Sequence, residues 1–264
     1  MDERDGVKLE MNFRSFKLIT FDITGTLLKY RSSPTEEYST VLNKHGIKVN
    51  ISILEELIKR NMKDMTKLHP NFGLKTGLGW DNYWRKFAQN VISGAIPKEY
   101  ASNNLKIITI VDDLMNTYST GETFKLQNGA IDLLKYLKKK QVPLGVISNY
   151  DPRIINIINN LGIADYFLFI LSSYQVGYAK PDIEIFQKAE SFVCNETDRK
   201  LFLHVGDSYA FDFVGAKSAG WSACLVHTDK QIITKEHPNI ADCIFNDFVE
   251  FKQFLMTNKP DKIC

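Results

Sequence analysis

The chain has 264 residues, which is enough for one large domain or for a domain with a smaller second one. It carries 33 Lys and Arg against 31 Asp and Glu, so its charge gives no reason to expect nucleic acid or an anionic membrane as the main partner. No stretch approaches the ~20 apolar residues of a membrane span, and the charged N-terminus is unlike a signal peptide. We therefore expect a cytoplasmic monomer, with the nucleus as the other possible location.

The first predicted element is a short buried strand at residues 17–21, because this run is apolar and rich in β-formers. The strand ends at Asp22, and Thr24, Gly25 and Thr26 follow it as a predicted turn. The strand therefore delivers a carboxylate at its C-terminal end.

Helical periodicity then dominates from about residue 34 to residue 120. The predicted helices cover residues 38–45, 51–65, 80–92 and 98–118, and a loop rich in Gly and Pro covers residues 69–79. Because no strong strand pattern interrupts these helices, segment 31–121 is predicted to be a separate all-helical unit.

From residue 128 onward, predicted strands and helices alternate. The strands cover residues 142–148, 167–171, 201–205 and 223–226. Asn128, Pro152 and Asp182 are predicted to begin three of the helices. Such alternation with short connections predicts an α/β fold with a doubly wound parallel sheet, built from residues 16–30 and 122–260. The helical insertion then lies above the carboxyl ends of the strands, where open α/β sheets bind ligands.

Several polar side chains are predicted to converge on that edge of the sheet: Asp22, Ser148, Asn149, Lys180, Asp207 and Asp212. Each of them alone is typical of a cap or a turn. Together they bring two carboxylates, Asp22 and Asp207, close to one another, which is unfavourable unless a cation or a proton lies between them. Oxygen ligands favour a hard ion such as Mg²⁺, and a lysine beside a hydroxyl can hold a phosphoryl group.

The order of these segments resembles the four motifs of the haloacid dehalogenase superfamily. The matching segments are Asp22–Leu27, Ile147–Asn149, Lys180–Asp182 and Gly206–Asp212. The helical insertion is similar to the type 1 cap of that superfamily. A narrower resemblance is to the subfamily named for an insect rhythmically expressed gene, whose vertebrate members are named as haloacid dehalogenase-like hydrolase domain-containing proteins. The segments that carry it are Asn71–Gly73, Tyr83–Lys86, Ser148–Arg153 and Ile185–Ala189.

The resemblance implies a Rossmann-like core and an Mg²⁺-dependent hydrolase. In it, Asp22 is expected to be the nucleophile and a metal ligand, and the backbone carbonyl of Thr24 a second ligand. Asp207 is expected to bind Mg²⁺ directly. Asp212 is expected either to complete the metal site or to orient the metal waters and Lys180. Lys180 itself is expected to stabilise charge on the nucleophile and on the transferring group.

The resemblance also implies contacts with the substrate. Ser148 is expected to bond a phosphoryl oxygen, and Asn149 to assist it. Thr26, with nearby backbone N–H groups, is expected to position the turn after the nucleophile. Outside these motifs, His204 lies on a predicted buried strand and is expected to be a satisfied core histidine rather than a ligand.

The sequence departs from the superfamily pattern at Thr24. Phosphatases of the superfamily carry a second Asp there, which protonates the leaving oxygen and later activates water. A threonine supplies no proton at neutral pH, and general acid–base catalysis is typically worth about 10²–10⁴-fold. The insertion offers three candidates for a replacement, namely His45, His69 and Asp81.

Three functions therefore stay open on the sequence. The main expectation is a phosphatase of weak or narrow activity that acts on a small phosphate ester through an aspartyl-phosphate. The second is a catalytically silent relative that binds a phosphorylated ligand or a protein. The third is a dehalogenase or phosphonate hydrolase, since these members of the superfamily also lack the second Asp.

Overall fold

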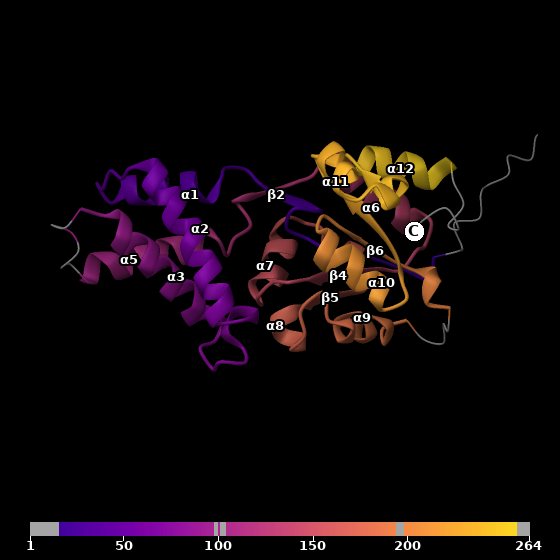
Figure 1. Cartoon of the computed structure of the whole chain (residues 1–264), viewed down its shortest axis with the longest axis horizontal. Coiled ribbons are helices and arrows are strands. Elements are labelled where there is room, and N and C mark those ends of the chain that lie inside the picture. The colour runs from indigo at the N-terminus through magenta and orange to yellow at the C-terminus, as the bar shows by residue number, and fades with distance from the viewer. Residues whose placement is uncertain (1–15, 98–99, 101–103, 194–197, 258–264) are drawn as a thin grey trace, which may run out of the picture.

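In a computed structural model, which describes residues 16–97, 100, 104–193 and 198–257, the chain forms a sheet-based core and a helical insertion (Figure 1). The strands are β1 (Leu18–Phe21), β2 (Leu28–Tyr30), β3 (Phe124–Leu126), β4 (Leu144–Ser148), β5 (Phe169–Ser172), β6 (Phe202–Gly206), β7 (Ser222–Val226) and β8 (Ile244–Phe245). The helices of the insertion are α1 (Pro34–Lys44), α2 (Ile51–Leu68), α3 (Trp80–Ala95) and α5 (Asn104–Thr117). The helices of the core are α6 (Ala130–Lys139), α7 (Arg153–Asn160), α8 (Ser173–Val176), α9 (Ile183–Glu190), α10 (Val214–Ser218), α11 (Lys230–Glu236) and α12 (Phe248–Thr257).

The core sheet has six strands in the order β5-β4-β1-β6-β7-β8, and every neighbouring pair is parallel. From β1 the chain winds outward first through β4 and β5, and later through β6, β7 and β8. The winding direction therefore reverses beside β1, and such a reversal is where open α/β sheets place their ligands. The doubly wound parallel sheet that the sequence predicts is confirmed.

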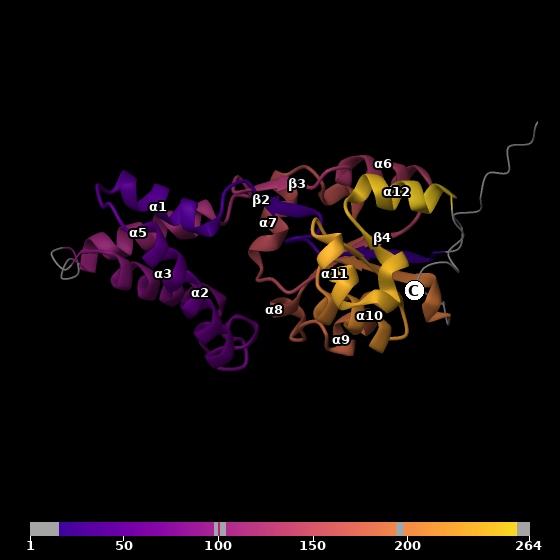
Figure 2. The same ribbon diagram turned by 45° about the horizontal axis from the view of Figure 1, so that its top comes forward.

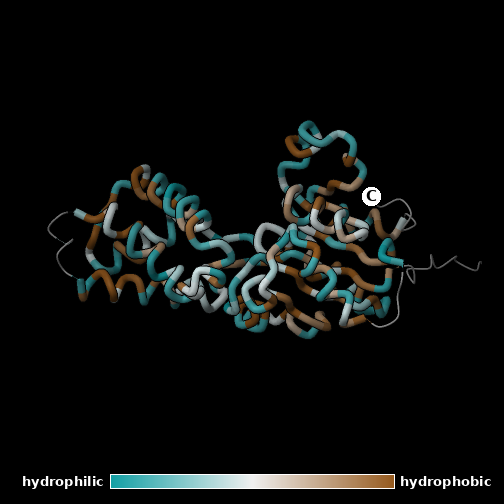
Figure 3. Tube along the Cα trace, turned by 60° about the horizontal axis from the view of Figure 1, so that its bottom comes forward, coloured by the Kyte–Doolittle hydropathy of each residue, from teal (hydrophilic) through white to brown (hydrophobic). Residues whose placement is uncertain are grey.

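Helices cover both faces of this sheet. Helices α6 and α12 pack together on one face, and α9 and α10 pack together on the other (Figures 1 and 2). Strands β1, β4 and β6 are buried along their whole length, as expected for strands that are covered on both sides. Figure 3 shows the result as hydrophobic segments inside the core, with hydrophilic turns around them.

The insertion has a hydrophobic cluster of its own. All of its buried members lie between Tyr38 and Met115, whereas the core cluster draws on residues 16–28 and 124–255. The chain leaves the core through β2 and returns through β3, and these two strands pair antiparallel with Tyr30 opposite Phe124. Two separate clusters support the predicted helical cap, and the domain bounds at residues 31 and 121 stay a prediction.

Polar contacts join the insertion to the core. The indole Nε1 of Trp84 on α3 donates to Asp151 Oδ2 at 2.7 Å. The same carboxylate holds the Arg153 guanidinium, whose carbon lies 5.3 Å from the ring centre of Trp84 and 5.4 Å from that of Trp80. Nearby, the Asn71 amide donates to the Ser173 carbonyl at 2.9 Å. Three of the four segments that carry the subfamily resemblance therefore meet at this contact.

Some local expectations were wrong. Helix α6 begins after Gly129, which adopts a left-handed conformation, and the Asn128 side chain donates to Asp247 instead of capping the helix. The side chain of Asp182 makes no capping hydrogen bond, although α9 begins directly after it. The segment after Asp207 is helical, as the alternation of strands and helices predicts, but it starts as a π-helical turn over Tyr209–Phe213 before α10. Part of the helix predicted at 98–118 lies outside the described residues.

Among the described residues, no helix has both the length and the apolar character that a membrane span requires.

Candidate active site

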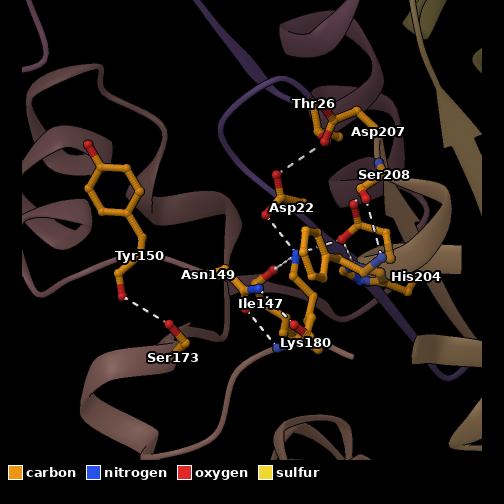
Figure 4. A network of polar contacts seen from close by, with 12 residues as sticks. Asp22, Thr26, Ile147, Asn149, Tyr150, Ser173, Lys180, His204, Asp207 and Ser208 are labelled. Carbon is orange, nitrogen blue, oxygen red and sulfur yellow. Dashed lines mark hydrogen bonds and ion pairs between the residues drawn. The ribbon is translucent and has the colours of Figure 1, made fainter. Parts of the chain in front are cut away.

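The carboxyl ends of three central strands bring the predicted polar residues together (Figure 4). Asp22 follows β1, Ser148 ends β4, and Asp207 follows β6. Because β1 lies between β4 and β6, these three side chains share one edge of the sheet. The Asp22 carboxyl group is nearly buried there, with 9% of the side chain exposed.

The Lys180 ammonium group is the centre of this cluster. Its Nζ donates to Asp22 Oδ1 at 2.7 Å, to Asp212 Oδ1 at 2.6 Å and to the carbonyl of Ile147 at 2.8 Å. These three contacts use all three N–H bonds of the ammonium group. Lys180 is therefore fixed in place, 2% exposed at its side chain, and directed at the expected nucleophile.

Charge in this buried cluster is unevenly shared. Burial acts to lower the pKa of Lys180, but the carboxylates of Asp212 and Asp22 outweigh it and raise that pKa. Burial also acts to raise the pKa of Asp212, yet Lys180 and His204 hold it well below its ordinary value. Burial raises the pKa of Asp22, although the positive charge of Lys180 acts to lower it. Asp22 and Asp212 share Lys180 as their partner. The charge of Lys180 is thus secured by Asp212, and Asp22 is the less strongly neutralised carboxylate.

Asp207 faces Asp22, the expected nucleophile, across a tight turn. The Thr26 hydroxyl contacts Asp207 Oδ1 at 3.3 Å and Asp22 Oδ2 at 3.4 Å, so it lies between the two carboxylates. Burial and the negative charges of Asp22 and Asp212 raise the pKa of Asp207 to about 7. Gly25 has φ +91°, and a Cβ at this position would meet Asp207 Oδ2 at 2.3 Å. Glycine is therefore required at this turn for both backbone and space.

Thr24 occupies the position at which the superfamily's acid is expected. Its Oγ1 is buried and has no hydrogen-bond partner among the described residues. An unpaired buried hydroxyl costs about 1–3 kcal/mol, so a bound group that pairs with it would bind more tightly.

The two residues that end β4 have different surroundings. Ser148 is 2% exposed, and its hydroxyl forms no hydrogen bond with another described residue, which leaves it able to bond a ligand. The Asn149 amide donates to the Lys180 carbonyl at 2.8 Å and accepts from the Lys180 N–H at 2.7 Å. The Asn149 side chain is therefore bonded to the Lys180 backbone, and its expected contact with a substrate stays a prediction.

The Asp212 carboxyl group lies behind Lys180. Its Oδ1 accepts from Lys180 and from His204 Nε2, at 2.6 and 3.0 Å, and its Oδ2 accepts from the Ser208 N–H at 2.9 Å. Of the two roles expected for Asp212, this arrangement favours the orientation of Lys180 over direct metal ligation.

The three candidate replacements for the acid are engaged elsewhere. His45 Nε2 contacts Asp113 at 2.7 Å, and His69 Nδ1 contacts the Thr76 hydroxyl at 2.9 Å. Asp81 accepts from Arg85 at 2.8 Å. All of these contacts lie within the insertion, so the structure does not bring any of the three to Asp22.

His204 is satisfied in the core, as the sequence predicts, but through partners that the sequence analysis missed. Its ring contacts Thr20 and Asp212. The signal that could have found Thr20 is a polar residue inside the apolar run 17–21, which mirrors the polar His204 inside the apolar run 201–205.

Comparison with known proteins places this geometry in a family. A sequence model for haloacid dehalogenase-like hydrolases matches residues 16–220. The chain belongs to this family. It is 35% identical over 222 residues to the Rhythmically expressed gene 2 protein of Drosophila melanogaster, covering 80% of this chain and 83% of that one. It is 31% identical over 210 residues to the haloacid dehalogenase-like hydrolase domain-containing protein 3 of Homo sapiens, covering 80% and 81%.

Solved structures share the fold of this family member. They include a 2-haloacid dehalogenase from Pseudomonas syringae (TM-score 0.63, 22% identity) and a HAD phosphatase from Thermococcus onnurineus (0.61, 20%). A third is the HAD-hydrolase YfnB from Bacillus subtilis bound to magnesium (0.64, 17%). Each match covers 91% of this chain and 98% of the other. Because their reactions differ, the shared fold does not select among them.

The donor set of this site fits a divalent cation. Asp22 and Asp207 present two carboxylates on either side of Thr26. Burial, followed by the negative charges of Asp22 and Asp212, raises the pKa of Asp207, and a cation between the carboxylates would offset both effects. No three His, Cys, Asp or Glu side chains among the described residues are grouped so as to hold a metal ion by themselves. A pair of carboxylates is a donor set through which Mg²⁺ commonly binds, with waters as its other ligands.

Proposed function

We propose that this chain is an Mg²⁺-dependent phosphatase of weak or narrow activity, acting on a small phosphate ester through an aspartyl-phosphate. The observation that carries the proposal is the Lys180 ammonium group bonded to Asp22 Oδ1 at 2.7 Å. A cation held this close to a buried carboxylate suits a nucleophile that must receive an anionic phosphoryl group.

In the proposed reaction, a carboxylate oxygen of Asp22 attacks phosphorus, and the bond from phosphorus to the ester oxygen breaks. Lys180 faces the negative charge of the transferring group, and the Ser148 hydroxyl donates to a phosphoryl oxygen. Water then cleaves the aspartyl-phosphate, releasing phosphate and restoring Asp22. Asp22, Asp207 and the carbonyl of Thr24 would hold Mg²⁺, which supplies charge neutralisation to this site when bound.

The weakness of the activity is expected from Thr24. The ester oxygen departs as an anion unless a proton reaches it, and Thr24 supplies none. A leaving group that is stable as an anion, such as a nitrophenolate, suffers least from this loss, and an alkyl alcohol suffers most. The proposed substrate is therefore a small phosphorylated molecule with a stabilised leaving group.

A second candidate is a silent relative that binds a phosphorylated ligand. It is favoured by the pairing of His45, His69 and Asp81 within the insertion, because none of these three candidate acids then reaches the site. Dehalogenase chemistry is a third outcome, since halide leaves without a proton.

The deciding experiment is hydrolysis of 4-nitrophenyl phosphate with Mg²⁺ by the wild type, Asp22→Asn and Thr24→Asp. Asp81→Asn is the matched control, because it removes a carboxylate of the insertion. We expect slow turnover in the wild type and the control, none in Asp22→Asn, and a faster rate in Thr24→Asp. No turnover in any variant would reject the phosphatase in favour of the binding role. Halide release from a 2-haloacid would favour the dehalogenase.

A further inference from the structure

One buried histidine joins the central strands to the cluster around Lys180. His204 lies on β6 and is fully buried, directly opposite Thr20 in the register of β1. Its Nδ1 is 2.8 Å from the Thr20 hydroxyl, and its Nε2 is 3.0 Å from Asp212 Oδ1. Phe186 packs against the ring in a T-shaped arrangement, with centroids 5.3 Å apart and planes at 85°. Both nitrogens are therefore engaged, and the ring is fixed.

The direction of these hydrogen bonds follows from the chemistry of the partners. An ionised carboxylate only accepts, so the hydrogen between His204 and Asp212 is carried by Nε2. In a neutral ring, Nδ1 then accepts from the Thr20 hydroxyl. The only other hydrogen bond of that hydroxyl to a described residue is a long one to the Leu203 carbonyl, at 3.4 Å. Thr20 thus favours the tautomer that donates to Asp212.

The Asp212 carboxylate links His204 to Lys180. Its Oδ1 receives both the His204 ring and the Lys180 ammonium group, while its Oδ2 is held by the Ser208 N–H. If His204 stopped donating, the carboxyl group would lose one of its three protein donors and could turn about its Cβ–Cγ bond. The Lys180 ammonium group would then lose a fixed partner beside Asp22.

We propose that His204 is a positioning residue, oriented by Thr20, which fixes Asp212 and thereby holds the Lys180 ammonium group against Asp22. A histidine that merely fills space on β6 would be replaceable by an apolar side chain of similar size. A positioning histidine would be replaceable only by a side chain that still donates to Asp212. These two roles give opposite results with leucine and glutamine.

The experiment compares the full chain as wild type, His204→Leu, His204→Gln and Thr20→Val, with 4-nitrophenyl phosphate and Mg²⁺; this arm rests on the proposed function. We expect His204→Leu to lower kcat by about 10–100-fold, the usual effect of removing a partner behind a site residue, with KM little changed. His204→Gln should recover most of the loss, since its amide can donate where Nε2 does. Thr20→Val should lie between the wild type and His204→Leu.

Two measurements separate positioning from damage to the fold. The increase in Tm on adding Mg²⁺ should be the same in His204→Leu and the wild type, because Asp22 and Asp207 are unchanged. Nitrogen-15 NMR of histidine-labelled protein should show Nε2 protonated in the wild type, with its resonance shifted in Asp212→Asn. Should His204→Leu not fold, His204→Gln and Thr20→Val carry the test.

A wild-type kcat in His204→Leu, or an equal loss in leucine and glutamine variants, overturns the proposal. If the wild type itself has no turnover, the proposed function fails, and the NMR measurement alone decides the positioning contact. An unprotonated Nε2 would then reject it.

Discussion

The indole N–H of Trp84 in the helical insertion donates to Asp151 of the core, and that carboxylate also holds Arg153. Because Asp151 is fully buried, its charge depends on both partners. Arg153 of the core donates to both oxygens of Asp151, and Trp84 of the insertion adds a further donor to Oδ2, so one buried carboxylate contacts both parts of the molecule.

This contact predicts an asymmetry between two tryptophans. Trp84→Phe keeps a ring over Arg153 but removes the donor to Asp151, so we expect a loss of stability of about 1–3 kcal/mol. Trp80→Phe is the matched control, because Trp80 also stacks on Arg153 while its indole N–H bonds to no described residue. Urea unfolding measures the difference, and hydrogen exchange should increase on α3 in Trp84→Phe. Equal stabilities of the two variants would contradict the assigned contact.

Removing the buried cation should cost far more. Lys180→Met leaves Asp22 and Asp212 facing one another without their shared partner, and breaking such a buried pair typically costs about 3–5 kcal/mol. Lys180→Met/Asp212→Asn should recover part of that loss, because one of the two charges is gone. Chemical denaturation without a divalent cation makes the comparison, and a double variant less stable than the single one would be inconsistent with charge as the cause.

Alanine substitutions at Gly25 and Gly46 distinguish the cost of backbone strain from the cost of a steric clash with the site. Both have positive φ, so alanine at either position costs roughly 1–2 kcal/mol. Only at Gly25 would the new Cβ also strike Asp207, since nothing lies within 4 Å at Gly46. We expect Gly25→Ala to lose more stability than Gly46→Ala and to lose the increase in Tm caused by Mg²⁺. Retention of that increase would show that Asp207 is not pressed against the turn.

The raised pKa of Asp207 predicts a pH dependence in the absence of divalent cations. The folded state holds this proton up to a pKa of about 7, whereas the ordinary value is 3.8. The unfolded chain therefore releases the proton first, and the free energy of unfolding falls as pH rises from about 4 to about 7. Asp207→Asn lacks this titration, so the wild type should lose stability relative to the variant over that range in EDTA. Parallel pH profiles of the two proteins would reject it, and Mg²⁺ should flatten the wild-type profile.

The central strands and the carboxylates that follow them were predicted well, because each depends on a short continuous stretch of sequence. The apolar run 17–21 ends at Asp22, and the run 201–205 ends before Asp207, so each carboxylate lies where its strand stops. Strands β2, β3 and β8 were missed because they have only two or three residues, too few to show a period.

Contacts between distant side chains were beyond sequence reasoning. The Asn149 amide reaches the Lys180 backbone, and Trp84 reaches Asp151, across 31 and 67 residues of chain. Which partner each one meets depends on how whole elements pack, and periodicity does not encode that. The expected cap of α6 was wrong for a local reason, because Gly129 takes up the left-handed turn and turns Asn128 toward Asp247.

The pairing of β2 with β3 has a consequence for how this scaffold can be rebuilt. Tyr30 lies opposite Phe124, so the chain that departs for the insertion comes back on the adjacent strand. Paired Cα atoms of antiparallel strands are only about 4.5–5.5 Å apart, a gap that a two-residue turn closes. The ninety-odd residues between them are therefore interchangeable in principle with a tight turn or a foreign module. Such a graft would change the side chains and ligands that can reach Asp22, while the strand order and connections of the six-stranded sheet would stay the same.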